Sequence, residues 1–275
     1  MTYRTLLVHI DDSRHSEART AFALDLALKH DAHLIGLYAV CQDLFRPVFK
    51  RGDGLNLAKL EARGAERMQR ACERFTAAAT RAGCPFEWRA PAGPATDAAV
   101  LHARHADLVV LGQRDPEDEA SFVARDFIED VVMNSGRPVI VLPYAGRTPS
   151  FGENVVIAWD GSREAARALA DALPIVKRAR FVTVSVVEKH PDRDEPAGFD
   201  AAGYLERHGI HAGFTSIPRV SGVGTGATLL NQVADAHASL LVMGAYGHAR
   251  ATEYVLGGVT RALLETMTVP VLMSH

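Results

Sequence analysis

Runs of apolar residues alternate with longer amphipathic segments along the chain. The first run, Arg4–Ile10, has a buried-strand pattern, and an alanine-rich helical pattern over Ser16–Lys29 follows it. A second apolar run covers Ala32–Val40, and a long helical pattern with a polar face covers Gly54–Ala82. Short apolar strands that alternate with helices predict a parallel sheet covered by helices on both faces. The pattern therefore predicts an α/β fold.

The same series of elements occurs twice. The strand Asn154–Ala158 repeats the opening strand and places Ser162 where the first series has Ser13, an offset of 149 residues. In the second halves, His105–Gly112 lies over His237–Gly244 at an offset of 132 residues. The repeat predicts two domains with one fold, each a doubly wound, Rossmann-like parallel sheet of five strands.

The two domains are expected at residues 1–145 and 152–275. A segment that contains Gly, Pro and Ser, Tyr144–Glu153, would join them. The third strand of each domain has the weakest pattern, over Phe86–Ala90 and Ile210–Ile217.

A glycine-containing segment follows the strand pattern Leu240–Met243. Two residues separate Gly244 from Gly247, and nine more separate Gly247 from the pair Gly257-Gly258, at the start of a helical pattern. Glycines let backbone N–H groups approach an anion, and a helix N-terminus adds a partial positive charge. The segment is typical of a phosphate-binding loop, although the same spacing also occurs in ordinary strand-to-helix turns.

An acidic residue is expected near this segment. Asp160 follows the first strand of the second domain, and Gly244 ends the fourth. Ligands of open parallel sheets lie beyond the carboxyl ends of the strands, so both would border one crevice if these strands are neighbours. A carboxylate there could accept hydrogen bonds from a ribose hydroxyl or an adenine amine. The arrangement predicts a nucleotide site in the second domain.

The equivalent segment of the first domain is acidic instead. At the offset of 132 residues, Asp115, Arg125 and Asp126 take the places of the last three glycines. Acidic side chains repel polyphosphate, and Pro116 removes a backbone donor. The first domain is therefore not expected to bind ATP, and Asp11 is expected to cap the helix that follows it.

Composition narrows the function further. The net charge of −3 gives no support for nucleic-acid binding, and no apolar run is long enough to span a membrane. The three cysteines have no metal-like spacing and are expected to be free thiols in the cytoplasm. The histidines form no ligand set with acids or thiols, so no metal site is expected. No catalytic constellation is evident, which favours a binding protein with at most weak ATPase activity.

Several sequence motifs resemble the universal stress protein family in its tandem two-domain form, over essentially the whole chain. These motifs are the openings VHIDDS and VIAWDGS, the pre-loop strands DLVVLG and SLLVMG, and the closing strands RPVIVLPY and VPVLMSH. The resemblance implies two α/β domains of the adenine-nucleotide alpha-hydrolase-like type. Nucleotide-binding members have a hydroxyl residue after the third loop glycine, where this chain has Gly258; Thr260 lies two residues further on.

The resemblance also implies a set of nucleotide-binding residues, in which Asp160 contacts the base and the glycine segment holds the phosphates. The set comprises Ala158, Trp159, Asp160, Val186, Met243, Gly244, Gly247, His248, Gly257, Gly258, Val259 and Thr260. ATP, accompanied by Mg²⁺, is the expected ligand. Trp159 would either stack on the adenine or fill the pocket.

The expected function is stress-response signalling, in which the second domain binds ATP or another adenine nucleotide and protein partners sense its state. The alternatives are an interaction protein without a nucleotide and a weak ATPase. The two domains are expected to form an internal pseudo-dimer through pairing of Val139–Leu142 with Val269–Met273, and two chains could form a homodimer.

Overall fold

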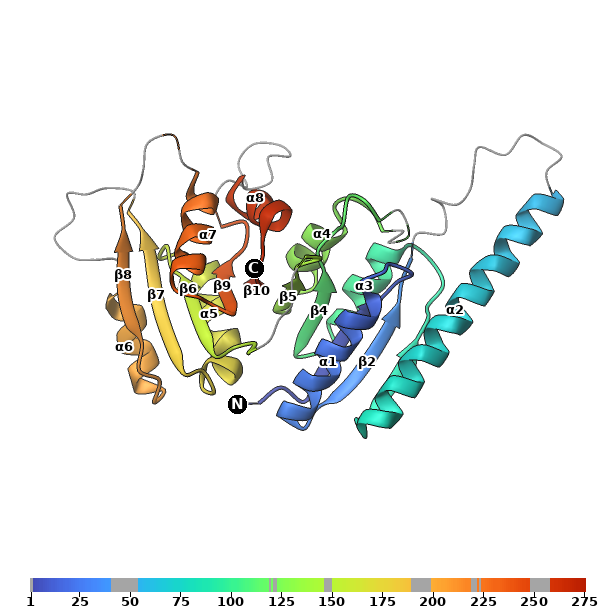
Figure 1. Ribbon diagram of the computed structural model, residues 1–275, viewed down its shortest axis with the longest axis horizontal. Coiled ribbons are helices and arrows are strands. Elements are labelled where there is room, and N and C mark those ends of the chain that lie inside the picture. The colour runs from blue at the N-terminus through green and yellow to red at the C-terminus, as the bar shows by residue number, and fades with distance from the viewer. Residues whose placement is uncertain are drawn as a thin grey trace. The chain divides into compact units, whose positions relative to one another are not determined.

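The computed structural model describes residues 2–40, 54–118, 120, 123–145, 150–188, 199–218, 222, 224–247 and 258–275. Contacts between residues divide the chain into two compact units, Thr2–Arg137 and Pro138–His275. Each unit alternates strands with helices, and its sheet is mostly parallel (Figure 1). The predicted α/β class is therefore confirmed.

The sheet of the unit Thr2–Arg137 has the strand order β3-β2-β1-β4, with parallel neighbours. Its elements are β1 (Thr5–Ile10), α1 (Ser16–His30), β2 (His33–Tyr38), α2 (Gly54–Ala82), β3 (Phe86–Arg89), α3 (Ala95–Ala103), β4 (Leu108–Gly112) and α4 (Phe127–Asn134). Right-handed crossovers in this order place α1 and α2 on one face of the sheet and α3 and α4 on the other. The contacts of α1 with α2 and of α3 with α4 agree with that arrangement.

The core of this unit follows from strands that are apolar on both faces. Leu6, Leu7 and Val8 of β1 are completely buried, as expected for a central parallel strand. On the neighbouring strand β2, a Cβ atom on Gly36 would lie 2.6 Å from the ring of Phe75. The missing side chain thus lets α2 pack closely on the sheet.

The sheet of the unit Pro138–His275 has the strand order β5-β10-β9-β6-β7-β8. Its elements are β5 (Val139–Leu142), β6 (Asn154–Ala158), α5 (Arg163–Val176), β7 (Phe181–Val187), α6 (Phe199–Arg207), β8 (Gly213–Ile217), α7 (Thr225–Asp235), β9 (Leu240–Gly244), α8 (Gly258–Thr266) and β10 (Val271–Ser274). The strands β10, β9, β6, β7 and β8 are parallel to one another.

The pairing predicted for the two closing strands is present. The strand β5 runs antiparallel to β10, with Val141 opposite Val271 and Val139 opposite Met273. Because residue contacts group β5 with Pro138–His275, this pairing lies inside one compact unit. The domain limits at residues 145 and 152 remain a prediction.

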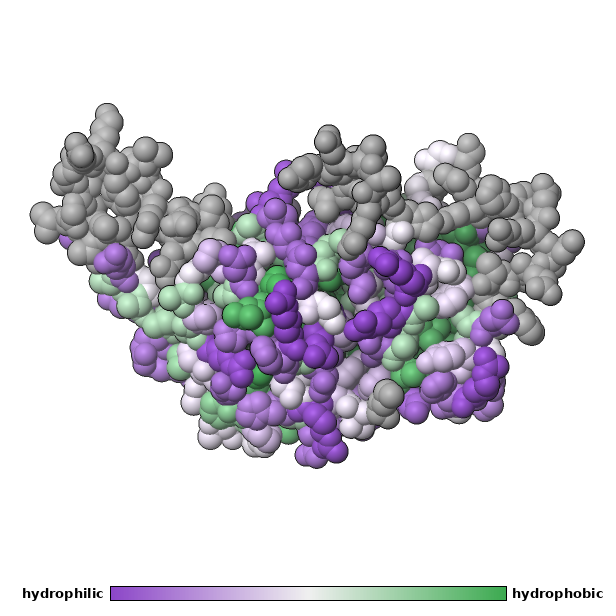
Figure 2. All heavy atoms as spheres, turned by 180° about the vertical axis from the view of Figure 1, so that it is seen from behind, coloured by the Kyte–Doolittle hydropathy of each residue, from purple (hydrophilic) through white to green (hydrophobic). Residues whose placement is uncertain are grey.

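Polar and apolar residues are interspersed on the surface. On the face drawn in Figure 2, hydrophobic residues form small groups separated by hydrophilic ones. The most exposed large apolar side chains are Leu28, Leu101 and Phe181, at 47%, 54% and 58% exposure. Within the described ranges, every helix is too short or too polar to cross a membrane.

Candidate functional site

The two strands that carry the predicted nucleotide site are neighbours. The strands β6 and β9 are parallel, with Val155 opposite Leu240 and Ile157 opposite Val242. Their carboxyl ends therefore lie at the same edge of the sheet. Asp160 follows β6 and Gly244 ends β9, so the condition for a shared crevice is met.

The end of β6 presents a carboxylate to solvent. The backbone N–H of Trp159 donates to the carbonyl of Ser185 on β7 at 2.9 Å, which extends the pairing beyond the strand. Asp160 is exposed, and its Oδ1 accepts from the backbone N–H of Ser162 at 3.0 Å. No described residue bonds its Oδ2 atom. Asp160 can therefore accept a hydrogen bond from a ligand.

A sharp turn links Asp160 to α5. Gly161 adopts a φ of 76°, in the left-handed region that favours glycine. Ser162 then caps the helix, because its Oγ accepts from the backbone N–H of Ala165 at 3.1 Å. The turn fixes the position of Asp160 relative to the N-terminus of α5.

Packing alone explains two of the glycines. A Cβ atom on Gly244 would lie 2.4 Å from the backbone nitrogen of Ala165, so the end of β9 lies directly against the first turn of α5. A Cβ atom on Gly247 would lie 2.8 Å from Oε2 of Glu164. Gly244 excludes a side chain because its neighbours are backbone atoms, whereas a side chain at position 247 would require the carboxylate of Glu164 to move.

Glu164 is a site residue that the sequence analysis missed. It is 3% exposed and forms an ion pair with Arg163. Burial raises the pKa of Glu164, but the hydrogen bond from Arg163 and a backbone hydrogen bond outweigh it, so that the pKa is lowered. A negative charge therefore lies beside the glycine segment. Its only signal in the sequence is an acidic residue two positions after the capping Ser162.

The described residues leave the start of α8 open. Gly258 is its first residue and is exposed, and no atom of a described residue lies within 4 Å of the position that a Cβ would take. Thr260 is 3% exposed, so its side chain lies in the interior and not at the open end of the helix. A hydroxyl at position 258 would fit, whereas Thr260 does not supply one there.

Of the other predicted site residues, some are described by the structure and two are not. Val186 on β7 and Met243 on β9 are buried, and Ala158 and Val259 are half-buried. His248 and Gly257 lie outside the described residues.

The equivalent acid of the first unit is buried in an ion pair. Asp11 is 3% exposed, and its Oδ1 accepts from Nη2 of Arg19 at 2.7 Å and from the hydroxyl of Ser13 at 2.6 Å. The expectation that Asp11 caps α1 is therefore wrong. The N-cap of α1 is His15, which makes no side-chain cap, because Asp11 is turned toward Arg19 instead.

The side chain of Arg19 lies between the carboxyl ends of β1 and β4 in this unit. Its Nε donates to the carbonyl of His9 at 2.7 Å, and its Nη1 lies 2.2 Å from where a Cβ on Gly112 would be. Burial lowers the pKa of His9 to about 4, and its Nε2 lies 2.7 Å from the carbonyl of Ala39. A neutral His9, a charged Arg19 and Asp11 thus form one buried cluster.

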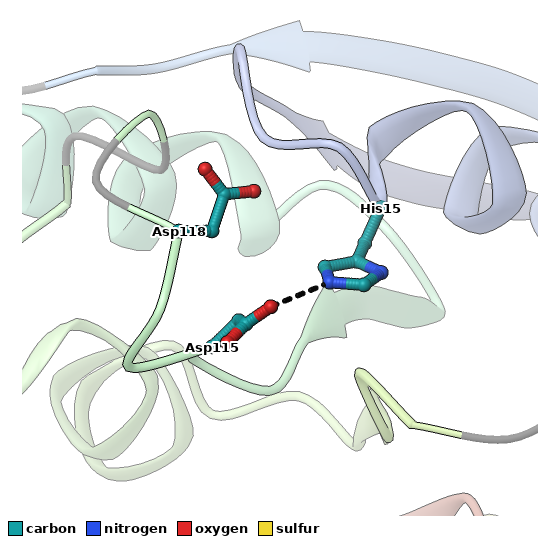
Figure 3. Close-up of side chains that lie close together, drawn as sticks. All are labelled: His15, Asp115 and Asp118. Carbon is teal, nitrogen blue, oxygen red and sulfur yellow. Dashed lines mark hydrogen bonds and ion pairs between the residues drawn. The ribbon is translucent and has the colours of Figure 1, made fainter.

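A second cluster joins the loop after β4 to the start of α1 (Figure 3). Asp115 is buried, and its Oδ2 lies 2.9 Å from Nε2 of His15 and 3.0 Å from Nε of Arg14. The hydrogen bonds from His15 and Arg14 hold the pKa of Asp115 well below its usual range. Asp118 accepts from the backbone N–H of Arg14 at 2.7 Å.

The sequence analysis also missed this grouping. The ligand atoms of His15, Asp115 and Asp118 lie within 4.8 Å of one another, as in a metal site. However, the guanidinium of Arg14 already bonds the Asp115 oxygen that faces His15. A divalent cation would have to displace it, so the cluster is better described as an ion-pair network.

Comparison with known proteins agrees with this architecture. The model of the universal stress protein family matches residues 2–143 and again residues 152–275. A universal stress protein from Archaeoglobus fulgidus DSM 4304 has a similar structure (TM-score 0.72, 18% identity), which covers 98% of this chain and 97% of its own. A putative universal stress protein from Pseudomonas aeruginosa UCBPP-PA14 is also similar in structure (TM-score 0.59, 14% identity). The match covers 99% of this chain and 93% of the Pseudomonas chain.

No curated protein sequence matches the chain. At 14–18% identity, the similarity to these structures shows the fold alone. Membership of the family is shown by the family model, which matches both halves of the sequence. The chain therefore belongs to the universal stress protein family and is a tandem member of it.

Proposed function

We propose that this protein binds ATP or another adenine nucleotide in its second unit and acts as a stress-response binding protein. The observation that carries the proposal is the pairing of β6 with β9, which brings Asp160 and the glycine segment to one edge of the sheet. Asp160 is exposed there, and the described part of the chain leaves the N-terminus of α8 at Gly258 open. A carboxylate for the ribose or base and a helix N-terminus for phosphate are the groups that a nucleotide needs.

The first unit is not proposed to bind a nucleotide at the equivalent place. Its acid, Asp11, bonds Arg19, and Arg19 occupies the space beside Gly112. A ligand would have to break a buried ion pair before it could reach the carboxylate, at a cost of several kcal/mol.

The competing function is an interaction protein that binds no nucleotide. Two observations favour it: the carboxylate of Glu164 lies beside Gly247, and Gly258 supplies no hydroxyl for the phosphates. A negative charge at this edge weakens the binding of a polyphosphate. Mg²⁺ bound with ATP would reduce that repulsion.

The proposed setting is the cytoplasm, where protein partners would sense the bound state. The thiols of Cys72 and Cys84 are free, which fits a reducing compartment. No catalytic base is proposed, and a slow ATPase reaction would be an incidental property of the site.

Calorimetric titration of ATP and Mg²⁺ into the full chain tests the proposal. Two variants probe separate parts of the site: Asp160→Ala removes the exposed carboxylate, and Gly258→Asp places a negative charge at the start of α8. Neither change collides with a neighbour that the structure describes, since Asp160 and Gly258 are both exposed. We expect micromolar binding that each variant weakens by about tenfold or more.

Asp235→Ala is the matched control, because Asp235 is an exposed acid of the same unit, at the end of α7. Its affinity should equal that of the unchanged protein. Absence of ATP binding would support the interaction protein without a nucleotide, whereas equal affinity in all four proteins would place the bound nucleotide outside the proposed site.

A further inference from the structure

The basic residues of α2 form a ridge along one side of the helix. They are Lys59, Arg63, Arg67, Arg70, Arg74 and Arg81. At 3.6 residues per turn, these positions fall within about 80° of the helix circumference. Six basic residues against three acidic ones give α2 a net charge of +3, whereas the whole chain carries −3. Positive charge is therefore concentrated on this helix.

Part of the ridge already has partners. Arg67 pairs with Asp12 at 3.2 Å, and Arg74 lies 3.8 Å from Glu17 on α1. In the described part of the chain, neither Arg63 nor Arg81 makes a hydrogen bond or ion pair, and both are exposed. Positive charge on the ridge therefore remains available to a partner.

The C-terminal half of the ridge borders a groove between α1 and α2. The groove has a volume of about 930 Å³. Its apolar lining includes Ala21, Leu24 and Leu28 of α1 and Ala78 of α2. Leu28 is 47% exposed at the rim of the groove, whereas Leu24 is 5% exposed and forms part of its floor. The described residues thus leave an apolar strip open next to a row of arginines.

The two walls of the groove differ in charge. The α2 wall carries Arg74 and Arg81, whereas the α1 wall carries Glu17 and Asp25. A nucleic acid would be repelled by the acidic wall, and a flat bilayer could not reach apolar residues on the floor of a groove. An amphipathic helix fits both walls if the edge that faces α2 is acidic and the edge that faces the acidic residues of α1 is not.

We propose that the α1–α2 groove binds an amphipathic helix of a partner protein. The acidic edge of that helix lies against Arg74 and Arg81, and its apolar residues cover Leu24 and Leu28. The lining residues of α1 run from Ser16 to Leu28, which corresponds to roughly 18 Å of helix. A partner segment of about three turns therefore spans the site. This docking surface is separate from the nucleotide crevice and does not depend on nucleotide binding.

A displayed peptide library tests the proposal on the full-length protein. The library consists of helical peptides of about four turns with one face randomised, and the selected peptides are resynthesised for affinity measurement. We expect them to carry Asp or Glu along one edge and large apolar residues at a spacing of three and four. Arg81→Glu and Leu28→Lys should each weaken their binding by about tenfold. Both positions are exposed, so neither change should unfold the protein.

Arg207→Glu is the matched control, because Arg207 is also an exposed arginine in the last turn of a helix. It should leave the affinity unchanged, and peptides with Lys in place of Glu should prefer the Arg81→Glu variant. Selected peptides without an acidic edge, or affinities unchanged by Arg81→Glu and Leu28→Lys, would overturn the proposal. Failure to select any peptide, with binding to phosphatidylglycerol vesicles that Arg81→Glu abolishes, would replace it with a lipid-binding surface.

Discussion

Oδ2 of Asp115 lies 2.9 Å from Nε2 of His15, at the place where the second unit has Gly247 beside Glu164. The internal repeat aligns Asp115 with Gly247 and His15 with Glu164. In both units a carboxylate lies at this place beside the first helix, but it comes from the loop in the first unit and from the helix in the second. An acid that comes from the helix leaves the loop position to Gly247, whose backbone N–H an anion can approach.

Restoring the hydroxyl at position 258 should strengthen nucleotide binding. Gly258→Ser places a donor at the start of α8, where no atom of the structure's described ranges lies within 4 Å of the new Cβ. A hydrogen bond to a charged phosphate contributes about 1.5–3 kcal/mol, so we expect the Kd for ATP to fall by about tenfold. Calorimetric titration measures the change. Gly258→Ala is the control, and an equal gain in this variant would exclude the hydroxyl as the cause.

Neutralising Glu164 should also strengthen nucleotide binding. Its carboxylate lies beside Gly247, where it repels a phosphate. Like charges a few ångströms apart near a protein surface repel by at least about 1 kcal/mol, so Glu164→Gln should lower the Kd for ATP by about fivefold. The gain should shrink as salt is added. Glu206→Gln, on the exposed side of α6, should leave the affinity unchanged, and unaltered binding by Glu164→Gln would place the phosphates elsewhere.

The Asp11–Arg19 pair should be essential to the stability of the first unit. Arg19→Met leaves the buried carboxylate of Asp11 without its cation. Removing one partner of a buried ion pair costs about 3–5 kcal/mol in the free energy of unfolding. Urea denaturation measures the loss.

The double variant Asp11→Asn/Arg19→Met separates charge from packing. It removes the uncompensated charge, while the amide oxygen of the new side chain can still accept from Ser13, so more than half of the lost stability should return. A double variant as unstable as Arg19→Met alone would mean that Arg19 acts through its contacts and not its charge.

The stability of the first unit should fall at mildly acidic pH. His9 has a pKa of about 4 in the folded protein, against about 6.5 when unfolded. Between these values the unfolded chain binds the additional proton, so the free energy of unfolding decreases as the pH falls through this window, by on the order of 3 kcal/mol. Asp11, whose pKa is lowered, adds its own loss only below its ordinary value of 3.8. Urea denaturation at about pH 7 and about pH 5 measures the effect, and His9→Gln should remove most of the difference.

Periodicity and internal repetition were sufficient to predict most of the fold. The apolar runs placed β1 and β6 correctly, because a central parallel strand is apolar on both faces. The repeat also indicated that β5 and β10 are equivalent closing strands, and the resemblance to the universal stress protein family predicted their pairing, which is present. At β8 the expected strand began three residues too early, at Ile210, because alternation is weak at the edge of a sheet.

The site was predicted less completely because its chemistry depends on contacts between distant residues. The sequence assigned a phosphate-binding role to Gly244, but its contact with Ala165 shows a packing requirement that no spacing rule reveals. Asp11 has the local pattern of a helix cap, yet the ion pair with Arg19 determines its orientation. Local propensity cannot predict which of two competing hydrogen-bond partners a side chain chooses after folding.

The antiparallel pairing of β5 with β10 has a consequence for synthesis on the ribosome. Val141 and Val271 pair although they are 130 residues apart in the sequence. When β5 emerges, the strand that it needs has not yet been translated, because β10 follows all the other elements of the same unit. Strand pairs that close over such long distances form slowly. The nascent chain therefore holds β5 without this partner until β10 has been translated, and a chain from which β10 is deleted would lack the pairing permanently.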